Sequence, residues 1–374
     1  MRALSADLIR RANKLHERIE LLVLRGRYHE ARSLCCRSLA NLKYSLYSNH
    51  SRVAKVVQTL AATYEGGGDY AQAQKLYQES LKLMGRAQTS NDAGLLRVNA
   101  LVKLGSLCVL RGQYKQAKLR YLRARALAQA SFGPNSLEMA AVLNGLGMLC
   151  KYSGRFDAAE QFYRRAFTIA NRILGHDHPE LASLYHNLGG LEHSRGRFAR
   201  AEQFTRRAVQ IRERALGSTH PEVAADVAAL AATLDGQGKY DEAEKLYKRT
   251  LIVFRRVYGP CHYEVAVNLG NLAANRQAQG RHKEAERLYR QSLAMKDRLL
   301  GPRSPDAALV RNNLGKLLTH LGRPGEAVPL LKAGLAAMEE RLAAEHPHLR
   351  KVRQNLREAV HALARSKARA RTGK

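Results

Sequence analysis

A glycine returns at an almost constant interval along this chain of 374 residues, and that repeat constrains the fold more than any other feature. The intervals between successive marker glycines are 42, 44, 42, 42, 42, 42 and 42 residues. Alanine stands five residues after every marker glycine, a small residue stands twelve after, and leucine stands eight before seven of the eight. The marker glycines are Gly26, Gly68, Gly112, Gly154, Gly196, Gly238, Gly280 and Gly322. Such a repeat predicts stacked structural units rather than separate globular domains.

Each unit is predicted to be a helical hairpin. Leucines recur at helical spacing before the glycine, as Leu143, Leu146 and Leu149 do before Gly154. The glycine suits the position just past a helix end, because it adopts the left-handed conformation easily. The alanine and the small residue lie about two helical turns apart on one face of the second helix, where their size allows two helix axes to approach closely. Prolines such as Pro179 suit the first turn of the next helix.

Eight such hairpins predict an all-α solenoid, in which neighbouring units bury the apolar faces that no unit buries alone. The ends differ, because Arg18 stands where leucine is expected in the first unit and Arg357 replaces the small residue of a ninth. We expect residues 347–364 to form a capping helix and the basic residues 365–374 to be disordered. The solenoid, residues 1–346, divides into predicted units at 3–46, 47–89, 90–134, 135–176, 177–218, 219–260, 261–302 and 303–346.

Lysine and arginine outnumber aspartate and glutamate by 63 to 32, which gives a formal net charge of +31. This excess favours acidic partners, although a compositional bias toward arginine produces the same number, and both explanations stay open. The five cysteines form no CxxC pair, so neither a zinc site nor a redox motif is predicted, and a reducing, cytoplasmic location fits them. We expect no signal peptide and no membrane span, because no run approaches the ~18–20 apolar residues that a span needs.

No catalytic, cofactor-binding or metal-binding constellation stands out in the sequence, so we predict a protein that is not an enzyme. His176 and His178 lack a third ligand in register for a metal. His186 and His193 are seven residues apart, too far for the paired histidines of an HExxH helix. No phosphate-binding GxxxxGK[ST] loop is present.

The repeat resembles the tetratricopeptide repeat. The linkers LGHDHPELA at Leu174–Ala182 and LGSTHPEVA at Leu216–Ala224 are similar to those of the 42-residue subclass found in kinesin light chains and nephrocystin-type proteins. The resemblance covers nearly the whole chain and implies a right-handed α-solenoid whose first helices line a concave, peptide-binding groove. Kinesin light chains also carry a heptad segment before the repeats, and none precedes the first hairpin here, so motor transport is not implied.

The resemblance places groove-facing residues nine and ten positions before each marker glycine, with a further row three positions before it. Asparagine is frequent there, and its amide both donates to and accepts from a peptide backbone. A simpler reading is that these asparagines bond a neighbouring loop or hairpin. The predicted groove residues are Lys103, Asn144, Lys151, His186, Asn187, His193, Asn271, Asn312 and Asn313. The groove is expected to be apolar at Ala228 and Ala229.

Basic residues also recur ten and eleven positions after the marker glycines and predict a stripe along the second helices. The stripe comprises Arg123, Arg164, Arg165, Arg206, Arg207, Lys248, Arg249 and Arg290. It is interpreted either as an anion-binding surface or as an ordinary solvated helix face.

The sequence therefore predicts a scaffold that binds an extended, acidic peptide or protein segment. The alternative is an electrostatic adaptor to nucleic acid or anionic membrane through the stripe and the basic tail. No known sequence motif supports this alternative. A peptide-pheromone-type regulator is neither supported nor excluded.

Overall fold

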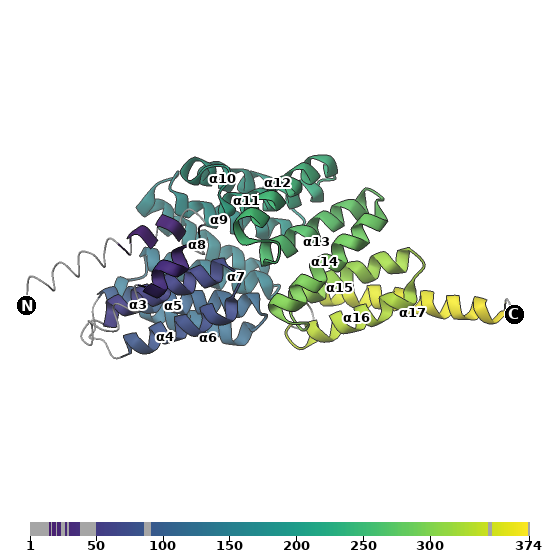
Figure 1. The fold of residues 1–374 in the computed structure, drawn as a ribbon, viewed down its shortest axis with the longest axis horizontal. Coiled ribbons are helices and arrows are strands. Elements are labelled where there is room, and N and C mark those ends of the chain that lie inside the picture. Colours follow the sequence, from purple (N-terminus) through teal and green to yellow (C-terminus); the bar gives the residue numbers. More distant parts are fainter. Residues whose placement is uncertain are drawn as a thin grey trace, which may run out of the picture.

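The computed structural model describes residues 15, 17–19, 21–23, 27, 30–37, 50–85, 91–342 and 346–372. From His50 onward these residues form helices α3 to α17, joined by short turns and linkers (Figure 1). The helices are α3 (His50–Gly66), α4 (Tyr70–Met84), α5 (Asn91–Leu110), α6 (Tyr114–Phe132), α7 (Leu137–Tyr152), α8 (Phe156–Leu174), α9 (Pro179–Ser194), α10 (Phe198–Leu216), α11 (Pro221–Gly236), α12 (Tyr240–Tyr258), α13 (Tyr263–Ala278), α14 (His282–Leu300), α15 (Pro305–His320), α16 (Pro324–Glu339) and α17 (Pro347–Thr372).

Consecutive helices pack as antiparallel hairpins, α3 with α4 through α15 with α16, and the all-α solenoid is confirmed. The first predicted hairpin, including Gly26, lies mostly outside the described residues. The alanines five residues after each marker glycine are fully buried, as expected for small residues at a close helix crossing. They are Ala31, Ala73, Ala117, Ala159, Ala201, Ala243, Ala285 and Ala327.

Glycines inside the first helices make room for the tyrosines of the second helices. Tyr163 is fully buried, and a Cβ atom built on Gly147 would lie 2.5 Å from its ring. Gly105 and Gly145 are equally close to the ring of Tyr121. A larger residue at Gly105 or Gly147 would therefore push apart the two helices of one hairpin, and at Gly145 it would push apart neighbouring hairpins.

Glycine and histidine define the helix ends. The described marker glycines have φ between 71° and 81°, and the glycines of the linkers between hairpins have φ between 80° and 85°. Both values lie in the left-handed region, as predicted. The first helices then begin with a capping residue, and at His178, His220 and His262 the Nδ1 atom accepts a hydrogen bond from the backbone N–H two residues later. Histidine in the linker is thus a helix cap.

Two helices differ from what the sequence predicts. The capping helix α17 continues to Thr372, eight residues past its expected end, so residues 365–372 are helical rather than disordered. Alanine, arginine and lysine favour helix, and no glycine interrupts them before Gly373. Helix α5 has the length and mean hydropathy (1.6) of a membrane span, although no span is predicted. Its apolar residues are largely buried in the solenoid, as in a core helix.

The solenoid winds far enough for its later linkers to contact its earlier hairpins. A Cβ atom built on Gly68, in the α3–α4 turn, would lie 2.9 Å from the ring of His262 in the α12–α13 linker. A Cβ atom built on Gly112, in the α5–α6 turn, would lie 2.6 Å from Pro305 at the start of α15. The ring of His346, before α17, approaches the backbone carbonyl of Tyr152 in the next hairpin turn. We call these contacts, each joining residues about 194 positions apart, the superhelical interface.

Candidate functional site

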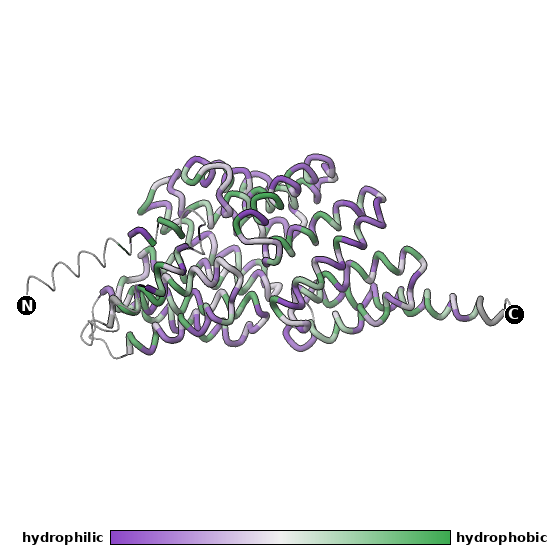
Figure 2. Tube along the Cα trace, in the orientation of Figure 1, coloured by the Kyte–Doolittle hydropathy of each residue, from purple (hydrophilic) through white to green (hydrophobic). Residues whose placement is uncertain are grey.

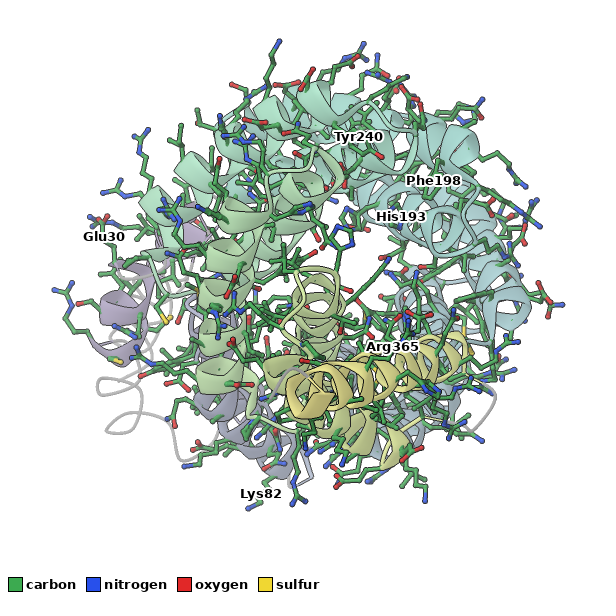
Figure 3. All side chains as sticks on the ribbon, turned by 90° about the vertical axis from the view of Figure 1, so that its right-hand side faces the viewer. Glu30, Lys82, His193, Phe198, Tyr240 and Arg365 are labelled. Atoms are coloured by element: carbon green, nitrogen blue, oxygen red, sulfur yellow. The ribbon has the colours of Figure 1, made fainter. Side chains whose placement is uncertain are left out.

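The superhelix encloses a pocket of about 1040 Å³ along its axis. In the end-on view the helices surround a central opening, and His193 points toward it (Figure 3). The first helices of the hairpins, α3, α5, α7, α9, α11, α13 and α15, all contribute lining residues, together with α17. Because each hairpin presents its first helix inward, one ligand lying on the axis contacts many repeats at once.

Lys151, at the end of α7, is the most unusual group in this pocket. Burial lowers its pKa to about 8, and the negative charge of Asp306 only partly opposes this effect. Its Nζ atom lies 4.7 Å from the centre of the Tyr152 ring, and among the described residues no carboxylate forms an ion pair with it. An inward-facing ammonium group without a counter-ion is suited to bind an anionic ligand group.

His193 on α9 lies close to Lys151. Burial lowers the pKa of its imidazole, a hydrogen bond to the Ala232 carbonyl opposes this in part, and the positive charge of Lys151 adds to the effect of burial. The ring packs edge-on against Phe198 with 5.3 Å between the ring centres. The neutral imidazole therefore offers a hydrogen bond rather than a second charge on this wall.

The opposite charge is supplied by the first turns of α13 and α15. The hydroxyl of Tyr263 donates a hydrogen bond to Oδ2 of Asp306 at 2.7 Å. Burial raises the pKa of Glu264, although the positive charges of His186 and Lys296 act in the other direction. The pocket thus has a basic wall at Lys151 and an acidic wall at Glu264 and Asp306. Sequence reasoning missed the acidic wall, because these acids only meet α7 when the superhelix closes.

The predicted groove residues separate into two groups. Those that line the pocket are Lys103, Lys151, His193, Asn271, Asn312 and Asn313. Of these, Lys103 lies 3.4 Å from Glu65, and Asn312 accepts a hydrogen bond from Asn355 at 2.7 Å. Asn313 and Asn271 lie half-buried on the pocket wall.

Three predicted groove residues instead connect neighbouring first helices. The amide of Asn187 donates to Oδ1 of Asn144 at 2.8 Å, and Nδ1 of His186 lies 2.7 Å from the buried carboxylate of Asp226. For Asn144, His186 and Asn187 the simpler reading, a bond to the adjacent hairpin, describes what the structure contains. Of the two alanines expected to make the groove apolar, Ala229 lines the pocket and Ala228 is not among the lining residues.

The predicted basic stripe is largely paired on α8 to α14. The residue six positions after the marker glycine is Glu160, Glu202, Glu244 or Glu286, and each binds the basic residue four positions later on its own helix. Each also binds a basic side chain from the hairpin turn of the next hairpin or from the last helical turn before it, and we call these the inter-hairpin ion pairs. They are Glu160–Arg195 at 2.5 Å, Glu202–Lys239 at 3.7 Å, Glu244–Arg276 and Glu286–Arg323 at 2.7 Å.

The remaining stripe residues have fewer partners. Arg207 lies 2.5 Å from Asp177, and Arg249 lies 3.5 Å from Glu213. Arg165 and Arg123 are exposed, and no ion pair to either is found in the described part of the chain. The stripe on α8 to α14 is therefore largely neutralised by carboxylates of its own helices, and the same carboxylates bind the next hairpin. Sequence reasoning missed this pairing, although the recurring Glu–Arg spacing of four residues was visible.

Within the described residues no group of three or more histidine, cysteine, aspartate or glutamate side chains is arranged to hold a metal ion. The five cysteines are all free thiols, and burial raises the pKa of Cys35 to about 12 and that of Cys108 and Cys150 above its usual range. A raised pKa disfavours the reactive thiolate, so these buried cysteines are packing residues.

Comparison with known proteins agrees with this architecture. The tetratricopeptide repeat family model matches residues 96–172, 139–214, 180–256, 222–298 and 264–340. No curated protein sequence matches the chain.

Several solved structures have a similar fold. A Rap protein complexed with competence and sporulation factor is 12% identical, with a TM-score of 0.59 over 96% of this chain and 98% of that one. The Rap conjugation gene regulator of the plasmid pLS20, in complex with the Phr* peptide, is 16% identical, with a TM-score of 0.59 over 88% and 94%. BtubC (BKLC) from P. vanneervenii is 22% identical over 62% and 92%, with a TM-score of 0.47. The two Rap structures show similarity of fold alone.

Proposed function

The chain belongs to the tetratricopeptide repeat family, as its repeats predicted, and from this premise we propose that it is a non-enzymatic scaffold that binds an extended, acidic peptide or protein segment in the axial pocket. The observation that carries the proposal is the inward-facing ammonium group of Lys151, which has no carboxylate partner among the described residues. A carboxylate of the ligand would complete this ion pair away from bulk water, where it is stronger than at the surface.

The shape and the polarity of the pocket support a peptide ligand. Asn271 and Asn313 lie on its wall with amide groups suited to a peptide backbone, and the apolar patch at Ala229 accommodates side chains. The acidic wall at Glu264 and Asp306 adds polarity, so we propose that the bound segment places its carboxylate at Lys151 and its amino or basic group opposite. The Rap structures, solved with bound factor or peptide, are consistent with this use of the fold. We also propose a cytoplasmic location, for which the free thiols are suited.

The proposal is tested by titrating the full chain with a peptide built from repeats of Glu-Pro-Asp, whose proline keeps it extended. We expect Lys151→Gln to weaken binding about tenfold or more, because a buried charge-assisted pair is lost. Lys245→Gln serves as the matched control, since it removes one exposed positive charge from the outer face of α12. Equal affinity of the Lys151 variant and the wild type would refute the proposed site.

The pH dependence provides a second readout. The peptide requires the charged form of Lys151, and the pKa of about 8 means that this form is lost as the pH rises through 8. We therefore expect affinity to be constant below pH 7 and to fall above pH 8 in the wild type, while Lys151→Gln shows no such fall. A fall of equal size in both proteins would assign the effect to another group.

A further inference from the structure

Helix α6 differs from the equivalent helices of the following hairpins on its outward face. It contains five basic residues and no aspartate or glutamate. At the position of the carboxylates Glu160, Glu202, Glu244 and Glu286 it carries Lys118, and at the position of their basic partners four residues later it carries Leu122. The pattern that neutralises the outer face elsewhere is thus replaced by a positive charge and an apolar side chain.

The two substituted residues and their neighbours form one continuous strip. Lys115, Lys118, Leu119, Leu122 and Arg123 are spaced three and four residues apart, so they share one face of the helix. Leu119 is 64% exposed and Leu122 is 43% exposed, which makes them two of the most exposed large apolar residues that the structure describes. Lys115, Lys118 and Arg123 are exposed as well, and no described carboxylate binds any of them. In Figure 1, α6 lies at the lower edge of the solenoid.

The neighbouring hairpin provides no substitute charge. In the later hairpins the carboxylate binds a basic residue of the next hairpin turn, but the next turn here presents Arg155. Lys118 and Arg155 both act on the thiol of Cys150, whose pKa they lower against the effect of burial, so the two cations lie near the same residue. In the described part of the chain Lys118 thus has no carboxylate partner, and the next hairpin turn adds another cation rather than an acid. An external carboxylate at this place would restore the pairing found in the other hairpins.

We propose that the strip Lys115, Lys118, Leu119, Leu122 and Arg123 is a docking surface for an acidic amphipathic helix of a partner protein. Apolar residues of that helix cover Leu119 and Leu122, and its carboxylates bind Lys118 and the flanking cations. Charge complementarity selects the occupant, because the strip itself contains no carboxylate. This surface is separate from the axial pocket, so one chain has the means to hold two partner segments.

A single protein segment fits the strip better than a membrane does. The equivalent helices on either side carry exposed acids, Glu79 on α4 and Asp157 on α8. A bilayer wide enough to reach α6 would bring these carboxylates to anionic headgroups, and like charges repel. The basic, apolar strip is one helix wide, which matches the width of one partner helix.

The test is fluorescence anisotropy with a labelled peptide built from repeats of Glu-Leu-Leu-Glu, titrated with the full chain. The double variant Lys118→Glu with Leu122→Arg gives α6 the residue pair found on α8, so it is expected to fold, and its melting curve verifies this. We expect at least tenfold weaker binding for this variant and unchanged binding for Lys245→Gln, which alters the net charge of the protein equally. Affinity should decrease with added salt, and a peptide with glutamine in place of glutamate should not bind.

Two further arms identify what binds. Lys151→Gln should bind the Glu-Leu-Leu-Glu peptide as the wild type does, which separates the strip from the pocket. Wild-type affinity in the folded double variant would overturn the proposal. Binding to phosphatidylserine vesicles that the double variant loses, without any binding of the peptide, would overturn it in favour of a membrane.

Discussion

The hairpin turns of the two halves of the solenoid have the same glycine-centred sequence pattern, but different contacts fix their positions. The turns at Gly68 and Gly112 are covered by linkers of the next superhelical turn, whereas nothing lies within 4 Å of a Cβ atom built on Gly196, Gly238 or Gly280. The open turns are tied to the preceding hairpin by inter-hairpin ion pairs, such as Glu160 with Arg195.

In the described part of the chain, no carboxylate at the equivalent position ties a covered turn to the preceding hairpin. At the position of the carboxylate, the preceding hairpins carry Arg32, Gln74 and Lys118. The only equivalent contact found at a described covered turn is a hydrogen bond that Arg111 donates to the uncharged side-chain oxygen of Gln74, at 2.9 Å. The hairpin turn is therefore fixed by packing against the next superhelical turn in one part of the chain. In the other part it is fixed by ion pairs with the previous hairpin. Local repeat stability is supplemented by long-range contacts where the superhelix closes, in contrast to an open repeat array.

The largest expected difference between the two regions is the effect of alanine at the marker glycine. Both Gly112→Ala and Gly238→Ala place a side chain at positive φ, which costs about 1–2 kcal/mol. At Gly112 the new Cβ atom would also lie 2.6 Å from Pro305, and overpacking of this kind costs a further ~1–3 kcal/mol. We expect a lower urea midpoint for Gly112→Ala than for Gly238→Ala. Equal midpoints would mean that the superhelical interface does not form in solution.

Acid should weaken the covered region selectively. Burial lowers the pKa of His262 to about 4, from an ordinary value of 6.5, and the Gly66 carbonyl opposes this only in part. The unfolded chain therefore takes up the proton first, so the stabilisation is complete above pH 6.5 and is lost as the pH falls toward 4. The loss is on the order of 3 kcal/mol for a shift of this size.

Asparagine separates this effect from helix capping, because it caps a helix without titrating in this range. Melting temperatures between pH 7 and 4 should fall less for His262→Asn than for the wild type. His178→Asn, which changes the same cap at an uncovered linker, should follow the wild-type curve. If the acid dependence persists unchanged in His262→Asn, His262 is not its source. Burial also lowers the pKa of His346, another residue of the superhelical interface.

Whether the sequence predicts a feature of the fold or of the pocket depends on how far apart in the chain the interacting residues lie. The helices, their glycine ends and the buried alanines follow from the repeat, because each depends on residues within one unit. The superhelical interface and the acidic wall of the pocket depend on the rotation accumulated over several hairpins. No motif within one repeat encodes that rotation, so Gly68 beside His262 and Asp306 near Lys151 could not be predicted. The two fates of the asparagine row, Asn187 bonded and Asn271 on the pocket wall, have the same origin.

The open turns should depend on their ion pairs by a smaller amount. Hydrogen bonds from Arg195 and Arg164 hold the pKa of Glu160 below its usual range, against the effect of burial. Glu160→Gln removes this charge and should cost about 1 kcal/mol, since Arg195 keeps Asp157 and Glu192 as partners. Chemical denaturation measures the change, and Gln74→Ala, at the covered equivalent, is the comparison. A larger loss at Gln74 than at Glu160 would contradict the division between the two regions.

The smallest expected effect comes from giving a covered turn the missing carboxylate. Lys118→Glu places an acid where Arg155 of the next hairpin turn can bind it, and an exposed pair of this kind contributes about 0.5 kcal/mol or less. A double-mutant cycle with Arg155→Ala isolates the pair, because the gain should vanish when the arginine is absent. A coupling energy near zero would indicate that packing against the next superhelical turn already fixes the α7–α8 turn in a position that the carboxylate cannot reach. A favourable coupling would instead show that the ion pair and the superhelical interface are compatible. Lysine at position 118 would then lower the stability by a small amount while keeping the outer strip of α6 positive.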